Sequence, residues 1–106
     1  MYVVLCTAPS EAAESLASKL VEERVAACVN VLPGVMSVYR WKGAVERAGE
    51  ALLVVKTSGD ALSALVARLR ALHPYEVPEI VAIEPAHVDA AYAAWVDAET
   101  KSVEKR

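Results

Sequence analysis

The chain has 106 residues, enough for one domain with its own hydrophobic core and too few for two. Its net charge is −3 with no basic run, and it lacks Phe, so a nucleic acid is not the expected partner. No apolar run approaches the roughly 20 residues that cross a bilayer. The first residues lack the basic segment of a signal peptide. We therefore predict a single domain, residues 1–106, located in the cytoplasm and bound to neither membrane nor nucleic acid.

The chain begins with a strand and an amphipathic helix. Residues 2–7 are an apolar strand that Pro9 ends. Ser10 is a favourable N-cap, and apolar residues then recur at helical spacing to about Arg24. These features predict a helix that lies with one apolar face against a sheet.

A long hairpin follows, and the length of its first arm, residues 28–42, is informative. Fully extended, this arm would span about 50 Å. A compact domain of this size has a diameter of only about 33 Å. We therefore expect the arm to bend at Pro33-Gly34, to overhang the body, or both. The second arm, residues 51–55, is apolar at every position, and Lys42-Gly43 and Ala48-Gly49-Glu50 are assigned to the reversal between the arms. Since an overhanging apolar hairpin is a liability in a monomer, we predict that it packs on another copy of the chain.

The second half of the chain repeats the pattern of the first. A second helix runs from Leu62 to the His73-Pro74 pair, a last strand covers residues 79–83, and Asp89 caps a C-terminal helix. Residues 101–106 are predicted to be a solvent-exposed tail.

This order predicts an α+β fold, the ferredoxin-like split β-α-β sandwich, extended by the long hairpin and a C-terminal helix. Its antiparallel sheet has the first strand between the third and fourth, and the second strand outside the third. Both main helices cover one face. The other face is also apolar in this sequence, which is a second reason to expect assembly.

The topology places Cys6 and His73 at the same edge of the predicted sheet. A thiolate and an imidazole suit copper or zinc. The simpler interpretations are a buried apolar thiol and a histidine that caps its helix. Two ligands are too few for a tight site, so water or a neighbouring subunit would complete it. The other cysteine, Cys28, is separated from Cys6 by a strand, so no disulfide is expected and both thiols should be reduced.

The remaining polar candidates are less specific. Glu76 and Glu79 could bind a hard metal ion or transfer protons, or could be solvated loop charges. Lys56 could attract an anion or pair with a carboxylate. Nothing resembles a Ser/His/Asp set, a nucleophile elbow or a phosphate-binding glycine loop. We therefore predict no catalytic residues and no enzymatic activity.

Four segments carry a family resemblance: LCTAPSE (5–11), LVEERVAACVNVLPGVMSVYRWKGAVE (20–46), LLVVKT (52–57) and HPYEVPEI (73–80). They resemble CutA, the divalent-cation tolerance family, over nearly the whole chain. The resemblance implies a cytosolic homotrimer of ferredoxin-like subunits, in which strands pair between subunits and hairpins wrap the neighbours. It also implies tolerance to copper and other divalent cations, no enzymatic activity, and no cofactor required for folding.

The resemblance further implies a ligand set. In the branch best described for copper, the proposed ligands are the Cys of the LCTAP strand and two consecutive His before PY. Cys6 and His73 match the first Cys and the second His, but Leu72 stands at the first His, so copper affinity should be weak.

The family also resembles PII-type signal proteins, which bind nucleotides between subunits. The alternative function is therefore a signalling module that binds a small anionic or nucleotide-like effector in inter-subunit clefts and contacts another, unidentified protein. The residues expected to line such a cleft are Trp41, Lys56, His73, Tyr75 and Glu79.

Overall fold

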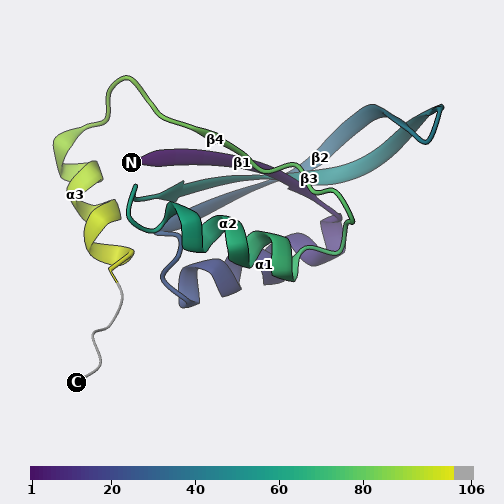
Figure 1. Ribbon diagram of the computed structural model, residues 1–106. Helices are drawn as coiled ribbons and strands as arrows, with labels where there is room; N and C mark the ends of the chain where they lie inside the picture. The colour runs from purple at the N-terminus through teal and green to yellow at the C-terminus, as the bar shows by residue number, and fades with distance from the viewer. Residues whose placement is uncertain (102–106) are drawn as a thin grey trace.

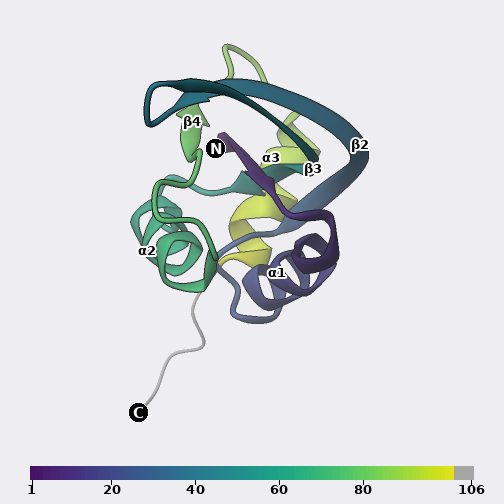
Figure 2. The ribbon, with the colours of Figure 1, turned by 90° about the vertical axis from the view of Figure 1, so that its right-hand side faces the viewer.

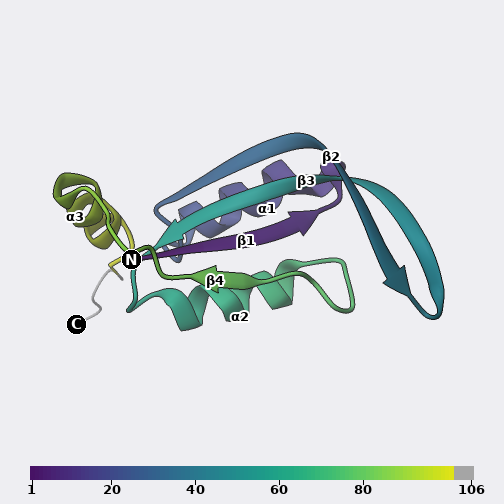
Figure 3. The same cartoon turned by 90° about the horizontal axis from the view of Figure 1, so that it is seen from above.

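The computed structural model describes residues 1–101 and has the predicted α+β architecture (Figure 1). Its elements are β1 (Tyr2–Ala8), α1 (Ser10–Glu22), β2 (Cys28–Trp41), β3 (Ala44–Thr57), α2 (Leu62–Leu72), β4 (Val81–Ile83) and α3 (Ala90–Glu99). The four strands form one sheet in the order β2-β3-β1-β4, and every neighbouring pair is antiparallel (Figure 3). The predicted strand order and ferredoxin-like topology are therefore confirmed.

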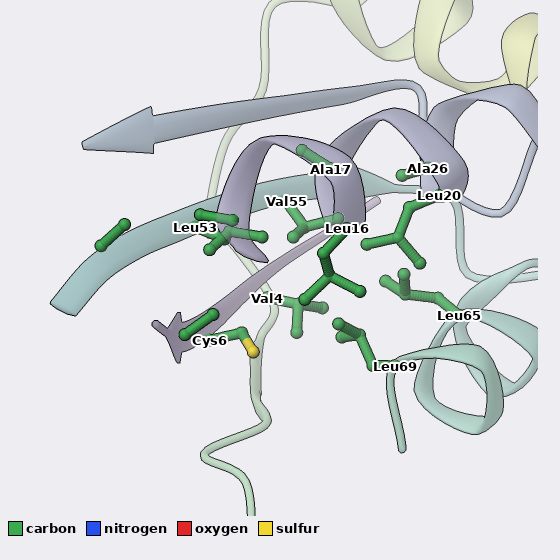
Figure 4. Packing of buried hydrophobic residues seen from close by; sticks show 13 residues of the cluster. Val4, Cys6, Leu16, Ala17, Leu20, Ala26, Leu53, Val55, Leu65 and Leu69 are labelled. Atoms are coloured by element: carbon green, nitrogen blue, oxygen red, sulfur yellow. The ribbon is translucent and has the colours of Figure 1, made fainter. Parts of the chain in front are cut away.

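Helices α1 and α2 lie side by side on one face of the sheet (Figures 1 and 2). The core between these layers combines sheet residues with one apolar stripe of each helix (Figure 4). Its largest fully buried members are Val4, Leu20, Leu53, Val55, Leu65 and Leu69. Burial of such side chains is the main stabilising contribution to the subunit.

The opposite face of the sheet is apolar and uncovered, as predicted. Strand alternation places Leu5 on this face, because its neighbours Val4 and Cys6 are buried beneath the helices. Val81 pairs with Leu5 and is 47% exposed, and Ile83, beyond it on β4, is 46% exposed. Among residues 1–101, no helix is long and apolar enough to cross a membrane.

The β2–β3 hairpin extends well beyond the body, so the molecule measures 49 × 33 × 21 Å (Figures 1 and 3). The strand register shifts between Leu32 and Val35, which confirms the predicted irregularity at Pro33-Gly34. Assigning Lys42-Gly43 to the reversal was correct, but assigning Ala48-Gly49-Glu50 to it was wrong, because these residues pair with β2 as part of β3. The turn consists only of Lys42 and Gly43, both with positive φ, as a tight two-residue hairpin turn requires.

Two element boundaries also differ from the predictions. Ser10 does not cap α1: the cap position is Pro9, without a side-chain hydrogen bond. The last strand begins at Val81 rather than residue 79, because the preceding segment leaves the sheet. The cap of α3 is confirmed, since Asp89 accepts a hydrogen bond from the amide of Tyr92 at 3.1 Å. The predicted tail lies outside the described residues except for Lys101, which is exposed.

Candidate functional site

A cleft opens where the hairpin leaves the body of the molecule. Strand β1 ends at Ala8, which pairs with Ala51, so the earlier half of β3 has no partner on that side. The segment 73–80 turns from α2 back to β4 at the same end of the sheet (Figure 3). The cleft between this segment and the hairpin has a volume of about 760 Å³. It is lined by Thr7, Ser37, Val38, Tyr39, Trp41, Glu50 and residues 74–79.

His73 lies directly after α2 and before the cleft residue Pro74, and it is 7% exposed. Although it was expected to line a cleft, it is not among the residues that line this one. Its Nδ1 accepts a hydrogen bond from the amide of Tyr75 at 3.1 Å. Its Nε2 therefore carries the proton and donates to the carbonyl oxygen of Thr7 at 2.8 Å. The imidazole therefore links the start of the 73–80 segment to the end of β1, and both of its ring nitrogens form hydrogen bonds.

Cys6 lies next to this contact. Its thiol donates to the same Thr7 carbonyl oxygen, with the sulfur 3.6 Å away. Burial, and then the nearby carboxylates of Glu79 and Glu50, raise the pKa of Cys6 to about 12 from 9.0. The structure thus brings together Cys6 and His73, the two candidate metal ligands, on one carbonyl group, and it keeps the thiol protonated at neutral pH.

Glu50 and Tyr75 form the second polar contact of the cleft. The Tyr75 hydroxyl donates to Oε2 of Glu50 at 2.5 Å, which joins the 73–80 segment to the hairpin. Desolvation, followed by this hydrogen bond and the Glu50 charge, raises the pKa of Tyr75. Glu50 itself is only 5% exposed, so this carboxylate is held largely away from bulk water.

Several residues assigned to a cleft from the sequence line this one, namely Trp41, Tyr75 and Glu79. Lys56 does not line it within one subunit, because its ammonium donates to Oδ1 of Asn30 on the neighbouring strand. Glu50 was missed, because it was assigned to the reversal of the hairpin. Its position directly before the apolar run 51–55 was the available signal, since it indicates a strand residue.

The donor set does not form a complete metal site within one subunit. Among residues 1–101, no three His, Cys, Asp or Glu side chains are arranged to hold a metal ion. Leu72, at the position of the missing histidine, packs against the hydrophobic core. Cys6 and His73 could supply one sulfur and one nitrogen, and the remaining ligands would come from water or another subunit.

Taken together, the fold and the cleft define a ferredoxin-like α+β protein with an acidic cleft beside a protruding hairpin. Residues 2–99 match the family model described as CutA1 divalent ion tolerance protein. A relative from Thermus thermophilus, named divalent-cation tolerance protein CutA, is 53% identical over 95 residues, which cover 89% of this chain and 92% of the relative. The chain belongs to the CutA1 divalent ion tolerance family.

Solved structures agree with this assignment. A PII-like protein CutA from Nostoc sp. PCC 7120, in apo form, superposes with a TM-score of 0.92 at 41% identity, covering 95% of this chain and 98% of that one. A protein from Archaeoglobus fulgidus, described as a periplasmic divalent cation tolerance protein CutA, gives 0.90 at 34% identity, covering 95% and 100%. The same subunit fold therefore occurs in proteins described as PII-like and as cation tolerance proteins.

Proposed function

We propose that this protein binds a divalent cation, with copper the best-suited ion, as a non-enzymatic homotrimer in the cytoplasm. The observation that carries the proposal is the convergence of the Cys6 thiol and the His73 imidazole on the Thr7 carbonyl. Sulfur and imidazole nitrogen are donors that copper prefers. The carboxylates of Glu50 and Glu79 add a negative field beside them.

The same geometry argues for weak binding. An ion at Nε2 of His73 would replace the hydrogen bond to Thr7, and an ion at Nδ1 would replace the one from Tyr75. An ion at Cys6 must also displace the thiol proton. Each lost hydrogen bond or proton offsets part of the free energy of ion binding. This agrees with the weak affinity that is expected because Leu72 stands in place of the first histidine.

The charge of the cleft favours a cation over an anionic effector. Three of its lining residues are glutamates, Glu50, Glu76 and Glu79, and within residues 1–101 the lining includes no Lys or Arg. An anion would be repelled there, whereas a cation would be attracted. The signalling alternative is supported by the likeness to the PII-like Nostoc protein, but not by the charge of the cleft in one subunit.

The proposed homotrimer is supported by surfaces that a single subunit leaves unsatisfied. Strand β2 is an edge strand of 14 residues, and the first half of β3 is unpaired on its other side. Met36 and Val38 of the hairpin are 64% and 54% exposed. Long open edges and exposed apolar side chains favour association with another chain.

Calorimetric titration of the reduced protein with Cu²⁺, and with Zn²⁺ as an ion that does not oxidise thiols, tests the metal site. We expect one ion per subunit for the wild type, and loss of binding in Cys6→Ser and His73→Ala. The matched control is His87→Ala, because His87 is exposed and does not line the cleft. Equal binding in all three variants would refute this site.

Light scattering and a hairpin variant test the assembly. The intact particle should have about three times the subunit mass. Trp41→Glu should weaken assembly, because Trp41 lies at the end of the exposed hairpin and is 39% exposed. A monomer at all concentrations would contradict the trimer, and an unchanged trimer in Trp41→Glu would show that the hairpin end is not an interface.

A further inference from the structure

Arg24, two residues after the end of α1, has a φ of +63°, a left-handed conformation that residues other than Gly rarely adopt. The chain leaves α1 there through a Schellman motif. The amide of Arg24 donates to the carbonyl oxygen of Val21, and the amide of Val25 donates to that of Leu20. Glycine is the usual residue at this position because it adopts the conformation without strain. Since arginine is strained here, a compensating contact of its side chain is expected.

The side chain of Arg24 makes that contact with the end of α3. Its Nε donates to the carbonyl oxygen of Lys101 at 2.7 Å, and its Nη2 donates to that of Ala98 at 3.0 Å. The last carbonyls of a helix have no partner within the helix and favour a nearby positive charge. The last turn of α3 contains no basic residue of its own. Arg24 therefore supplies from the end of α1 the charge that the end of α3 lacks.

Few other contacts hold α3, which lies at the end of the molecule opposite the hairpin (Figures 1 and 3). Val96 is the one buried residue of this helix, and it does not belong to the core between the sheet and the helices α1 and α2. Thr100, directly after the helix, is buried with its hydroxyl 2.8 Å from Oγ of Ser58. Trp95, the largest side chain of α3, is 43% exposed. A helix of 10 residues is marginal without packing, so these few contacts decide whether it stays docked.

We propose that Arg24 is a clasp for α3, and that α3 opens and closes as a unit while the sheet, α1 and α2 stay folded. Opening breaks the two hydrogen bonds of the guanidinium and the contact between Thr100 and Ser58. It also dismantles a second cleft of about 620 Å³, because Arg24, Thr100 and Lys101 are part of its lining. This conformational device uses none of the residues that are proposed to bind a metal ion.

Amide hydrogen exchange of the full-length protein tests the clasp in Arg24→Gly. Opening of α3 alone senses the loss of the guanidinium, so the amides of α3 should exchange about tenfold faster. Complete unfolding also releases the backbone strain, which glycine does not have. The slowest amides of β1 and β3 should therefore exchange at nearly the wild-type rate. In Arg24→Ala, which keeps the strain, the amides of α3 should be accelerated equally and those of β1 and β3 should also exchange faster.

The matched control is Arg68→Gln. Arg68 is likewise an exposed arginine with two hydrogen bonds, but both go to Glu23 and neither touches α3. Its loss should leave the exchange of α3 relative to β1 and β3 unchanged. Equal acceleration of α3 and of the two strands in Arg24→Gly would overturn the proposal, because it would show that α3 opens only when the whole subunit unfolds. Unchanged exchange of α3 in that variant would show that Arg24 does not hold the helix.

Discussion

The two halves of β3 differ in sequence and in surroundings, because residues 44–50 carry three charged side chains and residues 51–55 are all apolar. From Ala51 to Thr57 the strand lies between β1 and β2, and Leu53 and Val55 are completely buried beneath the helices. From Ala44 to Gly49 it pairs only with β2, and Val45 is 60% exposed. The difference arises because β1 ends at the start of the second half. Valine therefore has different surroundings in the two halves: Val55 is completely buried and Val45 is largely exposed, so the residue type alone does not tell which side chains stabilise the subunit.

The largest expected contrast is between a truncation in the body and one in the hairpin. Leu69→Ala removes a fully buried side chain and should lower the free energy of unfolding by about 2–5 kcal/mol. Val45→Ala removes an exposed side chain and should change the stability of the isolated subunit by less than about 0.5 kcal/mol. Urea denaturation at one fixed protein concentration measures both.

If Val45→Ala proves as destabilising as Leu69→Ala at concentrations where the protein is assembled, dilution provides the check. Loss of the Val45 effect on dilution would assign it to the interface between subunits. An effect of equal size in the monomer would contradict the division of β3 into two regions.

The next largest effect is a loss of folding stability at alkaline pH, which arises from the buried Cys6 of β1. The pKa of Cys6 is 9.0 in its ordinary setting and about 12 in the fold. Between these values the unfolded chain loses the thiol proton and the folded protein keeps it, so stability is fully present below pH 9 and falls as the pH rises towards 12. In this range the free energy of unfolding should fall by up to about 1.4 kcal/mol per pH unit.

Urea denaturation between about pH 8 and about pH 10.5 measures this slope. In Cys6→Ala the loss of stability at alkaline pH should be smaller. It should not vanish, because the raised pKa of Tyr75 also lowers the free energy of unfolding as the pH rises. Parallel curves for the wild type and Cys6→Ala would show that Cys6 ionises normally in the folded protein.

A smaller effect concerns the hydrogen bond between Tyr75 and Glu50, which joins the segment 73–80 to the hairpin. Tyr75→Phe removes the hydroxyl that donates to Glu50, and leaves a sheltered carboxylate without that partner. We expect a loss of about 1–3 kcal/mol in the free energy of unfolding. Tyr39→Phe is the control, because Tyr39 lines the same cleft and its hydroxyl has no hydrogen bond within residues 1–101. Equal losses in the two variants would mean that the Tyr75 contact does not stabilise the cleft.

The smallest effect tests the bend at the root of the hairpin. Gly34 has a φ of +76°, a conformation that L side chains rarely adopt, and no atom lies within 4 Å of an added Cβ. Gly34→Ala should therefore destabilise through backbone strain alone, by about 1–2 kcal/mol. Gly49 pairs with Met36 on the facing strand and has equal space without the positive φ, so Gly49→Ala should be nearly neutral. Thermal unfolding compares them, and similar melting temperatures would show that the bend is not strained.

Local patterns were sufficient for most of the fold. The periodicity of α1 and α2, the apolar strands and the Pro33-Gly34 break predicted the element order, the sheet order and the protruding hairpin. These features depend on residues a few positions apart, so they are visible in one sequence. The predicted juxtaposition of Cys6 and His73 also followed, because strand direction fixes which ends of the elements meet.

The sequence by itself determined the topology, the apolar outer face and the family. Only the tertiary structure decided the chemistry of the cleft. The burial of Glu50 depends on Tyr75, 25 residues away, and the proton position on His73 depends on Thr7, 66 residues away. Such contacts have no local period, because they form only when distant elements pack together. Their geometry sets which lone pairs of Glu50 and His73 are already used within the subunit.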